Sequence, residues 1–454
     1  MPVEEQKCDM LEGLALDTDN LEFSQAFDLV ESGKSPIIYL TGKAGTGKTT
    51  FLKYLKITTS RKMVVLAPTG VAAVNAGGQT IHSFFQIPPG FLYSPEDKRF
   101  QNQIGKSDSD KDSISDTFKY TRKKLNLIRG MDLLVIDEVS MVRADLMDIV
   151  DYLLRTFRKC NLPFGGVQTL LIGDAFQLPP IARNEERAVL DLFYNSLFFF
   201  DSKVIRENRP AYIELKKIYR QKDPSFVNLL NNVRENKVSS EDLISLCSRV
   251  CDEETFRKKK NCIFLAPTND VVDSYNRTRL DGLRTKPRTF MADVSGEFPR
   301  SSFPTDEELC LKVGAQVMLR RNNLPEYYNG TIGTITKITD TAIDVRTDHG
   351  IISVSMATWH NIRYEWNEEK KEIKETVIGE FRQWPLKLAW AITIHKSQGL
   401  TFEKVIVEPK NIFSPGQAYV ALSRCTSLKG LTLKSPISRY AIKTDPHALA
   451  FSRR

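Results

Sequence analysis

Residues 37–55 read IIYLTGKAGTGKTTFLKYL, and they say more about the architecture of this chain than any other segment. The apolar start predicts a buried strand, and the apolar spacing after the glycines predicts a helix. Between them, the glycines allow successive backbone N–H groups to turn inward around phosphate groups, and the helix N-terminus adds its positive dipole end. Strand, loop and helix in this order predict a phosphate-binding loop, with a chance match by a glycine-rich turn as the alternative.

Two side chains of this loop have specific predicted roles. Lys48 is expected to reach the outer phosphates of ATP or GTP, and the Thr49 hydroxyl is expected to ligate Mg²⁺. The residues predicted to bind the nucleotide here are Gly42, Gly45, Thr46, Gly47, Lys48, Thr49 and Thr50.

A second apolar run, LLVI at residues 133–136, ends in the adjacent acids Asp137 and Glu138. A parallel sheet presents such residues at the carboxyl edge of its strands. We expect Asp137 to hold Mg²⁺ and Glu138 to polarise the attacking water, because hydrolysis needs a carboxylate beside the γ-phosphate as well as one on the metal. Two neighbouring acids in a loop could otherwise be solvated surface.

A third apolar run, TLLI at residues 169–172, continues into GDAFQLPP at residues 173–180. An amide at such a strand end can sense the γ-phosphate by hydrogen bonding, and Gln177 is the candidate. A strand followed by a proline-stiffened loop is the alternative interpretation. Together the three strand ends outline one RecA-like α/β core.

The sequence contains a faint internal duplication, because VVLAPTG at residues 64–70 is echoed by IFLAPTN at residues 263–269. Two similar cores are implied, and only the first has a phosphate loop. The second core is therefore expected to complete the ATP site with arginines from across a cleft. Arg220 and Arg424 are the candidates, although position alone would equally suit surface arginines.

The composition suits a polyanionic partner. The chain of 454 residues carries 64 basic and 56 acidic side chains, a net charge of +8 (64 − 56), and its 41% apolar content is ample for two or more packed domains. No apolar run approaches the roughly 20 residues that span a bilayer, and the acidic N-terminus is unlike a secretion signal. No membrane partner is expected, and the expected location is cytoplasmic, nucleoid or nuclear. Seven scattered cysteines predict reduced thiols without a zinc pattern.

Five motifs in order resemble those of superfamily 1B helicases, and the match covers nearly the whole chain. They lie at residues 42–49, 137–138, 173–180, 393–399 (TIHKSQG) and 417–424. Within that group, APTGVAA at residues 67–73 followed by GGQTIHSF at residues 77–84 looks most like the PIF (petite integration frequency) family. The short chain is similar to bacterial members such as those of Bacteroides.

The resemblance implies an ATP- and Mg²⁺-dependent motor that moves 5′→3′ on single-stranded DNA. Its implied substrates are duplexes and their junctions with single strands, DNA–RNA hybrids and G-quadruplexes. Its implied biological role is genome maintenance. A monomer is expected, with a dimer on DNA as the alternative. Gln25 matches an amide that reads the adenine edge, although it could be an ordinary exposed helix residue. Arg220 and Arg424 match two γ-phosphate arginines, and Gln398 and Gly399 match the nucleotide site.

The loops after the two echoed strands are expected to contact the DNA backbone, because small side chains and free N–H groups let phosphates approach closely. These residues are Pro68, Thr69 and Gly70 in the first core, and Thr268 and Asn269 in the second. His82, Ser83 and Phe84 combine hydrogen bonding with an aromatic face for base stacking, although His82 could instead be a core histidine. The resemblance also places His395, Lys396 and Ser397 on DNA, near the ATP cleft.

The predicted fold class is α/β, with two RecA-like P-loop NTPase cores and two insertions. Residues 1–87 and 126–205 form the first core, and residues 206–289 and 387–454 form the second. A polar, proline-containing tract marks residues 88–125, where the resemblance implies a wedge and a mobile loop is the plainer interpretation. Short β-rich stretches in residues 290–386 predict an SH3-like barrel, with residues 368–372 at a solvated hairpin tip.

Two other functions fit parts of these patterns. A translocase that strips proteins from single strands would separate duplexes poorly, and a nucleotide-gated binding module would grip DNA without net travel. A complete hydrolytic set argues against the binding module, because a pure binder needs no water-activating groups. The members of that set are Lys48, Glu138, Gln177, Arg220 and Arg424.

Overall fold

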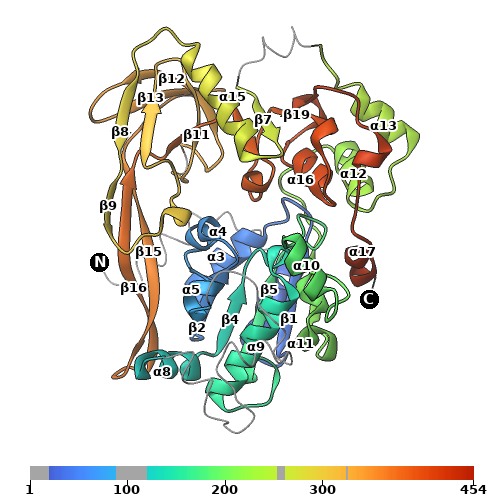
Figure 1. The fold of residues 1–454 in the computed structure, drawn as a ribbon, viewed down its shortest axis with the longest axis vertical. Helices are drawn as coiled ribbons and strands as arrows, with labels where there is room; N and C mark the ends of the chain where they lie inside the picture. The colour runs from blue at the N-terminus through green and yellow to red at the C-terminus, as the bar shows by residue number, and fades with distance from the viewer. Residues whose placement is uncertain (1–19, 88–119, 253–260, 324–325, 454) are drawn as a thin grey trace. The chain divides into compact units, whose positions relative to one another are not determined.

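The computed structural model describes residues 20–87, 120–252, 261–323 and 326–453 (Figure 1). These residues form two compact units. The first unit contains residues up to 175, 179–217 and 360–378, and the second contains residues 176–178, 218–359 and those from 379 onward. Most of the predicted wedge lies outside the described residues, and the division into four parts stays a prediction. No helix of the described segments is long and apolar enough to cross a bilayer.

The first unit is built on a six-stranded parallel sheet with the strand order β3-β2-β4-β5-β1-β6. The strands are β1 (Ile37–Gly42), β2 (Met63–Ala67), β3 (Gln79–Thr80), β4 (Leu133–Ile136), β5 (Gln168–Ile172) and β6 (Ala211–Leu215). β1, β4 and β5 are buried along their whole length, as the apolar runs of a parallel sheet require. Their carboxyl ends therefore lie side by side.

The edge strand β6 belongs to this first sheet. It pairs with β1 from Ile38 opposite Ala211 to Gly42 opposite Leu215. The sequence pattern alone assigns residues from 206 onward to the second core, so the boundary differs at this strand. The difference arises because pairing between segments this distant in the chain leaves no local signal.

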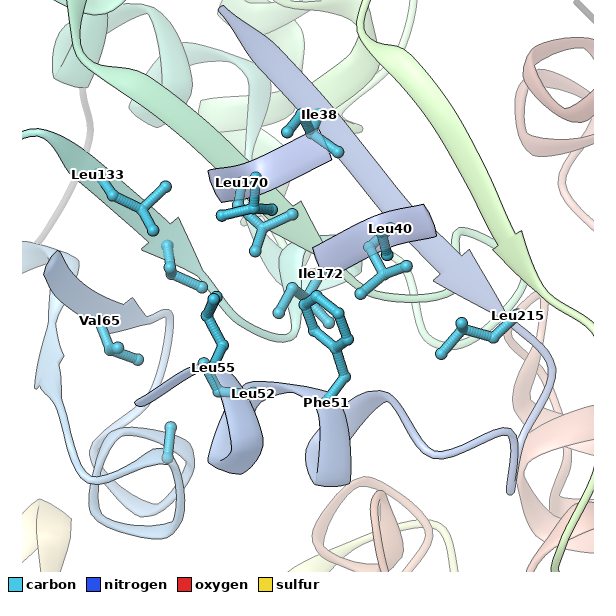
Figure 2. Close-up of a cluster of buried hydrophobic side chains, with 14 residues drawn as sticks. Ile38, Leu40, Phe51, Leu52, Leu55, Val65, Leu133, Leu170, Ile172 and Leu215 are labelled. Atoms are coloured by element: carbon cyan, nitrogen blue, oxygen red, sulfur yellow. The ribbon is translucent and has the colours of Figure 1, made fainter. Parts of the chain in front are cut away.

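Helices pack against this sheet and fix the position of the phosphate loop. Phe51, Leu52 and Leu55 of α3 lie against Leu170 and other buried strand residues (Figure 2). Burial of a side chain of this size stabilises the fold by about 1.5–3 kcal/mol, so the start of α3 is firmly held. The helices of this unit are α2 (Leu21–Ser32), α3 (Lys48–Thr58), α4 (Gly70–Ala76), α5 (Ile81–Phe85), α8 (Arg122–Gly130), α9 (Ala144–Arg158), α10 (Asn184–Leu190) and α11 (Lys203–Glu207).

The second unit combines a parallel and an antiparallel sheet. The parallel sheet has the order β18-β7-β19-β20, from β7 (Ile263–Ala266), β18 (Ala391–Thr393), β19 (Val405–Val407) and β20 (Leu431–Leu433). The antiparallel sheet has the order β14-β13-β12-β11-β17, from β11 (Gln316–Leu319), β12 (Ile332–Ile338), β13 (Ile343–Thr347), β14 (Gly350–Val354) and β17 (Leu386–Leu388). The helices are α12 (Pro224–Arg234), α13 (Ser240–Cys247), α15 (Asn269–Asp281), α16 (Gln417–Ser423) and α17 (Pro446–Ser452).

Smaller sheets complete the described β-structure. β8 (Arg288–Met291) pairs with β10 (Glu308–Leu311), and β9 (Asp293–Gly296) pairs with β16 (Glu372–Gln383). β16 also neighbours β15 (Ala357–Asn367), and these two strands form a long hairpin. Residues 360–378 of this hairpin, which we call the arm, belong to the first unit.

The arm lies against β2 and α8 of the first unit (Figure 1). The Trp366 ring covers Gly130 at the end of α8, and the Lys62 ammonium lies 5.6 Å from the centroid of that ring. Asn126 of α8 donates a 2.6 Å hydrogen bond to the Glu368 carboxylate. The turn at residues 368–372 is exposed, as predicted for a solvated tip, but the contacts beside it were not predicted.

Candidate functional site

The phosphate loop lies between the carboxyl end of β1 and the first turn of α3. Gly47, the residue before α3, has a φ of 91°, a left-handed conformation that a side chain would strain. The Lys48 ammonium donates to the carbonyl oxygens of Gly42 at 2.6 Å and Lys43 at 3.1 Å. The Thr46 hydroxyl donates to the same Lys43 oxygen at 2.9 Å. These bonds hold the ammonium over the loop.

Asp137 and Glu138 follow β4 at the same edge of the sheet. The N–H of Glu138 donates to the Asp137 carboxylate at 2.9 Å, and Glu138 has a φ of 49°. Such left-handed backbone at a residue other than glycine is typical of functional loops. Burial and the neighbouring Glu138 carboxylate raise the pKa of Asp137 to about 7, and Lys48 partly opposes this shift.

This pair of acids fits the predicted Mg²⁺ site. A half-buried carboxyl group with a raised pKa recovers its charge when a cation binds beside it, so Asp137 is suited to a metal. The described residues contain no group of three clustered metal-ligating side chains. Mg²⁺ needs no such group, because it keeps several waters and binds through one or two protein ligands plus phosphates. Thr49 and Asp137 therefore stay the predicted ligands.

The loop after β5 completes the row of three strand ends. Asp174 is buried, and the N–H of Ala175 donates to the Tyr39 hydroxyl of β1 at 3.3 Å. Burial and the Asp174 charge raise the pKa of Tyr39, so its hydroxyl stays protonated. The Gln177 side chain accepts a 3.4 Å hydrogen bond from Gln398, and both residues belong to the second unit.

The structure brings the two predicted arginines together in the second unit. Arg424 is 1% exposed, and its guanidinium donates to the carbonyl oxygens of Val420, Ser397 and Leu400 at 3.0–3.4 Å. Arg220 donates to the oxygens of Ser423 at 3.2 Å and Gly399 at 3.4 Å. Burial and the Arg424 charge lower the pKa of Arg220 to about 9. An anion beside the two guanidinium groups would relieve this repulsion, as a γ-phosphate role requires.

Two predicted DNA loops meet at the carboxyl edge of the second parallel sheet. The Lys396 ammonium donates to the side-chain oxygen of Asn269 at 2.9 Å, and both residues are exposed. Thr268 is also exposed, and His395 is half-buried, which lowers its pKa. Ser397 differs from the prediction of a DNA contact, because it is fully buried and its hydroxyl donates to the Ile394 oxygen at 2.7 Å.

The residues of the first unit that are predicted to contact DNA also include both accessible and buried side chains. Thr69 caps α4 by accepting a 3.2 Å hydrogen bond from the N–H of Ala72, and Pro68 and Gly70 beside it are half-buried. Ser83 is exposed and His82 is half-buried. The prediction that Phe84 stacks on a base is wrong for this structure. Its ring is fully buried, with the Lys124 ammonium 3.4 Å from its centroid.

Comparison with known proteins assigns the chain to a family. Residues 17–243 match the model of PIF1-like helicases. The ATP-dependent DNA helicase Pif1 of Bdellovibrio bacteriovorus is 30% identical over 444 residues, which cover 95% of this chain and 91% of that protein. The chain belongs to the PIF1-like helicase family. As a member, it is an ATP-hydrolysing helicase.

Other PIF1-like helicases agree with this assignment. The human ATP-dependent DNA helicase PIF1 is 33% identical over 92% of this chain, which spans 61% of the human protein. Bacteroides Pif1 in complex with ADP-AlF4 is 39% identical, with a TM-score of 0.86 over 95% of this chain and 96% of that chain. Bacteroides Pif1 bound to single-stranded DNA is also 39% identical, with a TM-score of 0.65 over 96% and 97% of the two chains. The parallel α/β cores are consistent with the RecA-like domains expected.

For this PIF1-like helicase, sequence patterns found the strand ends but not the partners of the arm. Tyr364 and Trp366, which contact β2 and α8, lie in an ordinary alternating strand pattern that gives no sign of a distant contact. Gln25 is exposed on α2, so its side chain is accessible for the predicted adenine contact. That contact, like the other chemical roles, stays a prediction.

Proposed function

We propose that this PIF1-like helicase is an ATP-dependent DNA helicase that moves 5′→3′ on single-stranded DNA and opens duplexes. The proposal extends to DNA–RNA hybrids and G-quadruplexes, and to genome maintenance. The observation that carries it is the meeting of the Lys48 loop with Asp137 and Glu138 at one sheet edge, which joins phosphate binding to metal and water chemistry. DNA as the substrate is supported by the names of the relatives, by Bacteroides Pif1 bound to single-stranded DNA, and by a structure of two Pif1 helicases at forked duplex DNA.

The proposed chemistry divides between the two units. Lys48 binds the outer phosphates, Gln25 reads the adenine edge and Glu138 orients the attacking water. Thr49 and Asp137 would hold Mg²⁺, which when bound would supply positive charge to the phosphate groups. In the second unit, Arg220 and Arg424 stabilise the charge that develops on the transferred phosphoryl group, and Gln177 senses the γ-phosphate.

The proposed DNA track uses the exposed strand-end loops. Lys396, Asn269 and Thr268 offer exposed polar groups at one sheet edge, which suits contacts to successive phosphates. Further proposed track residues are Pro68, Thr69, Gly70, His82, Ser83 and His395. We also infer that the five-stranded antiparallel sheet belongs to an SH3-like insertion.

Strand separation on matched duplexes tests this function. One duplex carries a 5′ single-stranded tail and the other a 3′ tail, and Lys48→Ala serves as the inactive control. We expect ATP-dependent opening of the 5′-tailed duplex alone. Opening from the 3′ tail would contradict the polarity, DNA-stimulated ATP turnover without opening would favour a translocase, and no turnover at all would exclude a motor.

A further inference from the structure

A cavity of about 880 Å³ lies in the second unit. It sits at the amino ends of three parallel strands, because Cys262 precedes β7, Lys404 precedes β19 and Gly430 precedes β20. The proposed DNA loops follow β7 and β18 at the opposite edge of the same sheet. A four-residue strand spans about 13 Å, so the cavity is separated from those loops by the depth of the sheet. Among residues given a role above, only Arg220 contributes to its lining.

The lining carries a net positive charge. Four cations and two acids line the cavity, a net charge of +2 (4 − 2): Arg220, Lys222, Lys404, Lys429, Asp223 and Glu403. Both acids already have partners. Asp223 accepts hydrogen bonds from the N–H and hydroxyl of Ser225 at 2.9 and 2.8 Å, and Glu403 lies 3.0 Å from the His349 ring. Lys404 is paired with Asp348 at 2.8 Å.

Two lysines of the lining are left without a counter-charge. Lys222 and Lys429 are exposed, and neither forms an ion pair with any residue in the described segments. Thr426 and Tyr328, which also line the cavity, add hydroxyl groups, and the Tyr328 side chain is 38% exposed. Ammonium and hydroxyl donors suit phosphate oxygens, and an exposed aromatic ring suits a stacked base.

We propose that this cavity is a second single-strand site, which binds the phosphate backbone of a DNA strand other than the one on the carboxyl-edge loops. The inference rests on the proposed helicase function, because opening a fork presents two single strands to one chain. An enclosed nucleotide site would bury its charged partners, whereas the exposed ammonium groups of Lys222 and Lys429 can contact a strand that crosses the mouth of the cavity. The site would hold the strand that the motor does not travel on.

A charge-matched pair of variants tests this site. The test variant is Lys222→Ala/Lys429→Ala. The control is Lys286→Ala/Lys337→Ala, which removes two exposed lysines of the same unit that do not line the cavity. Anisotropy measures binding to a fork with two single-stranded arms and to a duplex with the 5′ tail alone. DNA-stimulated ATP turnover is measured on both proteins in parallel.

We expect the wild type to bind the fork about five-fold more tightly than the single-tailed duplex, the size expected for two exposed charge pairs. The test variant should lose this preference, with its ATP turnover unchanged, and the control should keep it. The slope of log affinity against log salt on the fork should fall by about 1.4 in the test variant, about 0.7 for each lost phosphate contact. Uncharged methylphosphonate linkages in the second arm should abolish the preference of the wild type.

The contrary outcomes distinguish a failure of the second-site proposal from a failure of the helicase proposal. Equal binding of fork and single-tailed duplex by an active wild type would overturn the second site and leave the helicase proposal standing. A raised KM for ATP in the test variant would place the cavity in the ATP site. An equal loss of fork preference in the control variant would mean that overall charge, and not this cavity, produces the preference. A wild type without DNA-stimulated turnover would overturn the proposed function itself, and the second site with it.

Discussion

The backbone N–H of Val65 donates a 3.2 Å hydrogen bond to the hydroxyl of Tyr364 on the arm. β3 pairs with β2 only at Leu66 and Ala67, so the arm hydroxyl takes the place of a strand partner at Val65. The N–H of Tyr364 in turn donates to the side chain of Gln79 at 3.4 Å. The arm thus covers a sheet edge that would otherwise present unpaired backbone groups.

Tyr364→Phe should destabilise the first unit. Val65 is fully buried, and an unsatisfied buried N–H costs about 1–3 kcal/mol. Thermal unfolding should show a lower Tm for Tyr364→Phe, while the same chemical change at Tyr440, which is 88% exposed, should leave Tm unchanged. Equal Tm values for the two variants would mean that the arm is not bound to β2 in solution.

Gly130 and Trp366 should behave as an energetically coupled pair. A methyl group at Gly130 would overlap the Trp366 ring, so Gly130→Ala should cost about 1–3 kcal/mol by overpacking. In a Trp366→Ala background the same substitution should cost little, because the obstructing ring is gone. A double-mutant cycle by denaturant unfolding measures this coupling. Additive effects would contradict the contact.

Asp137→Asn should stabilise the protein at high pH and abolish ATP turnover. The pKa of Asp137 is raised to about 7 in the folded state, so ionisation above the unfolded value of 3.8 opposes folding. This cost begins as pH rises above 3.8 and is complete above about 7. The Tm gain should therefore be clear at pH 8 and vanish near pH 4. Asp28→Asn, at an exposed position of α2, should show no such pattern.

Arg424→Lys should lower the turnover number even though it keeps the charge. Arg424 spreads its donors over three carbonyl oxygens, a geometry that a lysine ammonium does not reproduce. For a γ-phosphate arginine we expect a loss of about 10³-fold in kcat, with nucleotide binding little changed. Steady-state kinetics and nucleotide titration separate these effects, with Arg279→Ala on the exposed face of α15 as the control. Unchanged kcat would remove Arg424 from the catalytic set.

Local patterns were enough to predict the central part of the fold. The apolar runs that end at Gly42, Asp137 and Gly173 are buried parallel strands, and adjacent pairing brings their ends to one edge. The echoed Ala-Pro-Thr segments likewise end β2 and β7. In each case the residues that specify the strand are neighbours in the chain, so hydrophobic periodicity carries the information.

Distant contacts account for what the sequence did not show. Phe84 looks like a stacking residue until Lys124 and the arm residue Tyr364 cover it. Ser397 looks available until the turn after β18 directs its hydroxyl to Ile394. The position of β6 depends on a pairing with β1 from far along the chain. Burial set by tertiary partners has no signature in the local pattern.

The arm also sets the order in which the protein can be completed during synthesis. The first unit has most of its residues once the ribosome reaches residue 217, but its last segment, residues 360–378, is complete only 161 positions after that point (378 − 217). At about 5–20 residues per second, this leaves the nascent sheet with an uncovered β2 edge for roughly 8–32 s. During that interval Val65 and the Gly130 surface are open to chaperones or to wrong strand pairing. The nascent chain therefore needs a protection that the finished chain later supplies through its own arm.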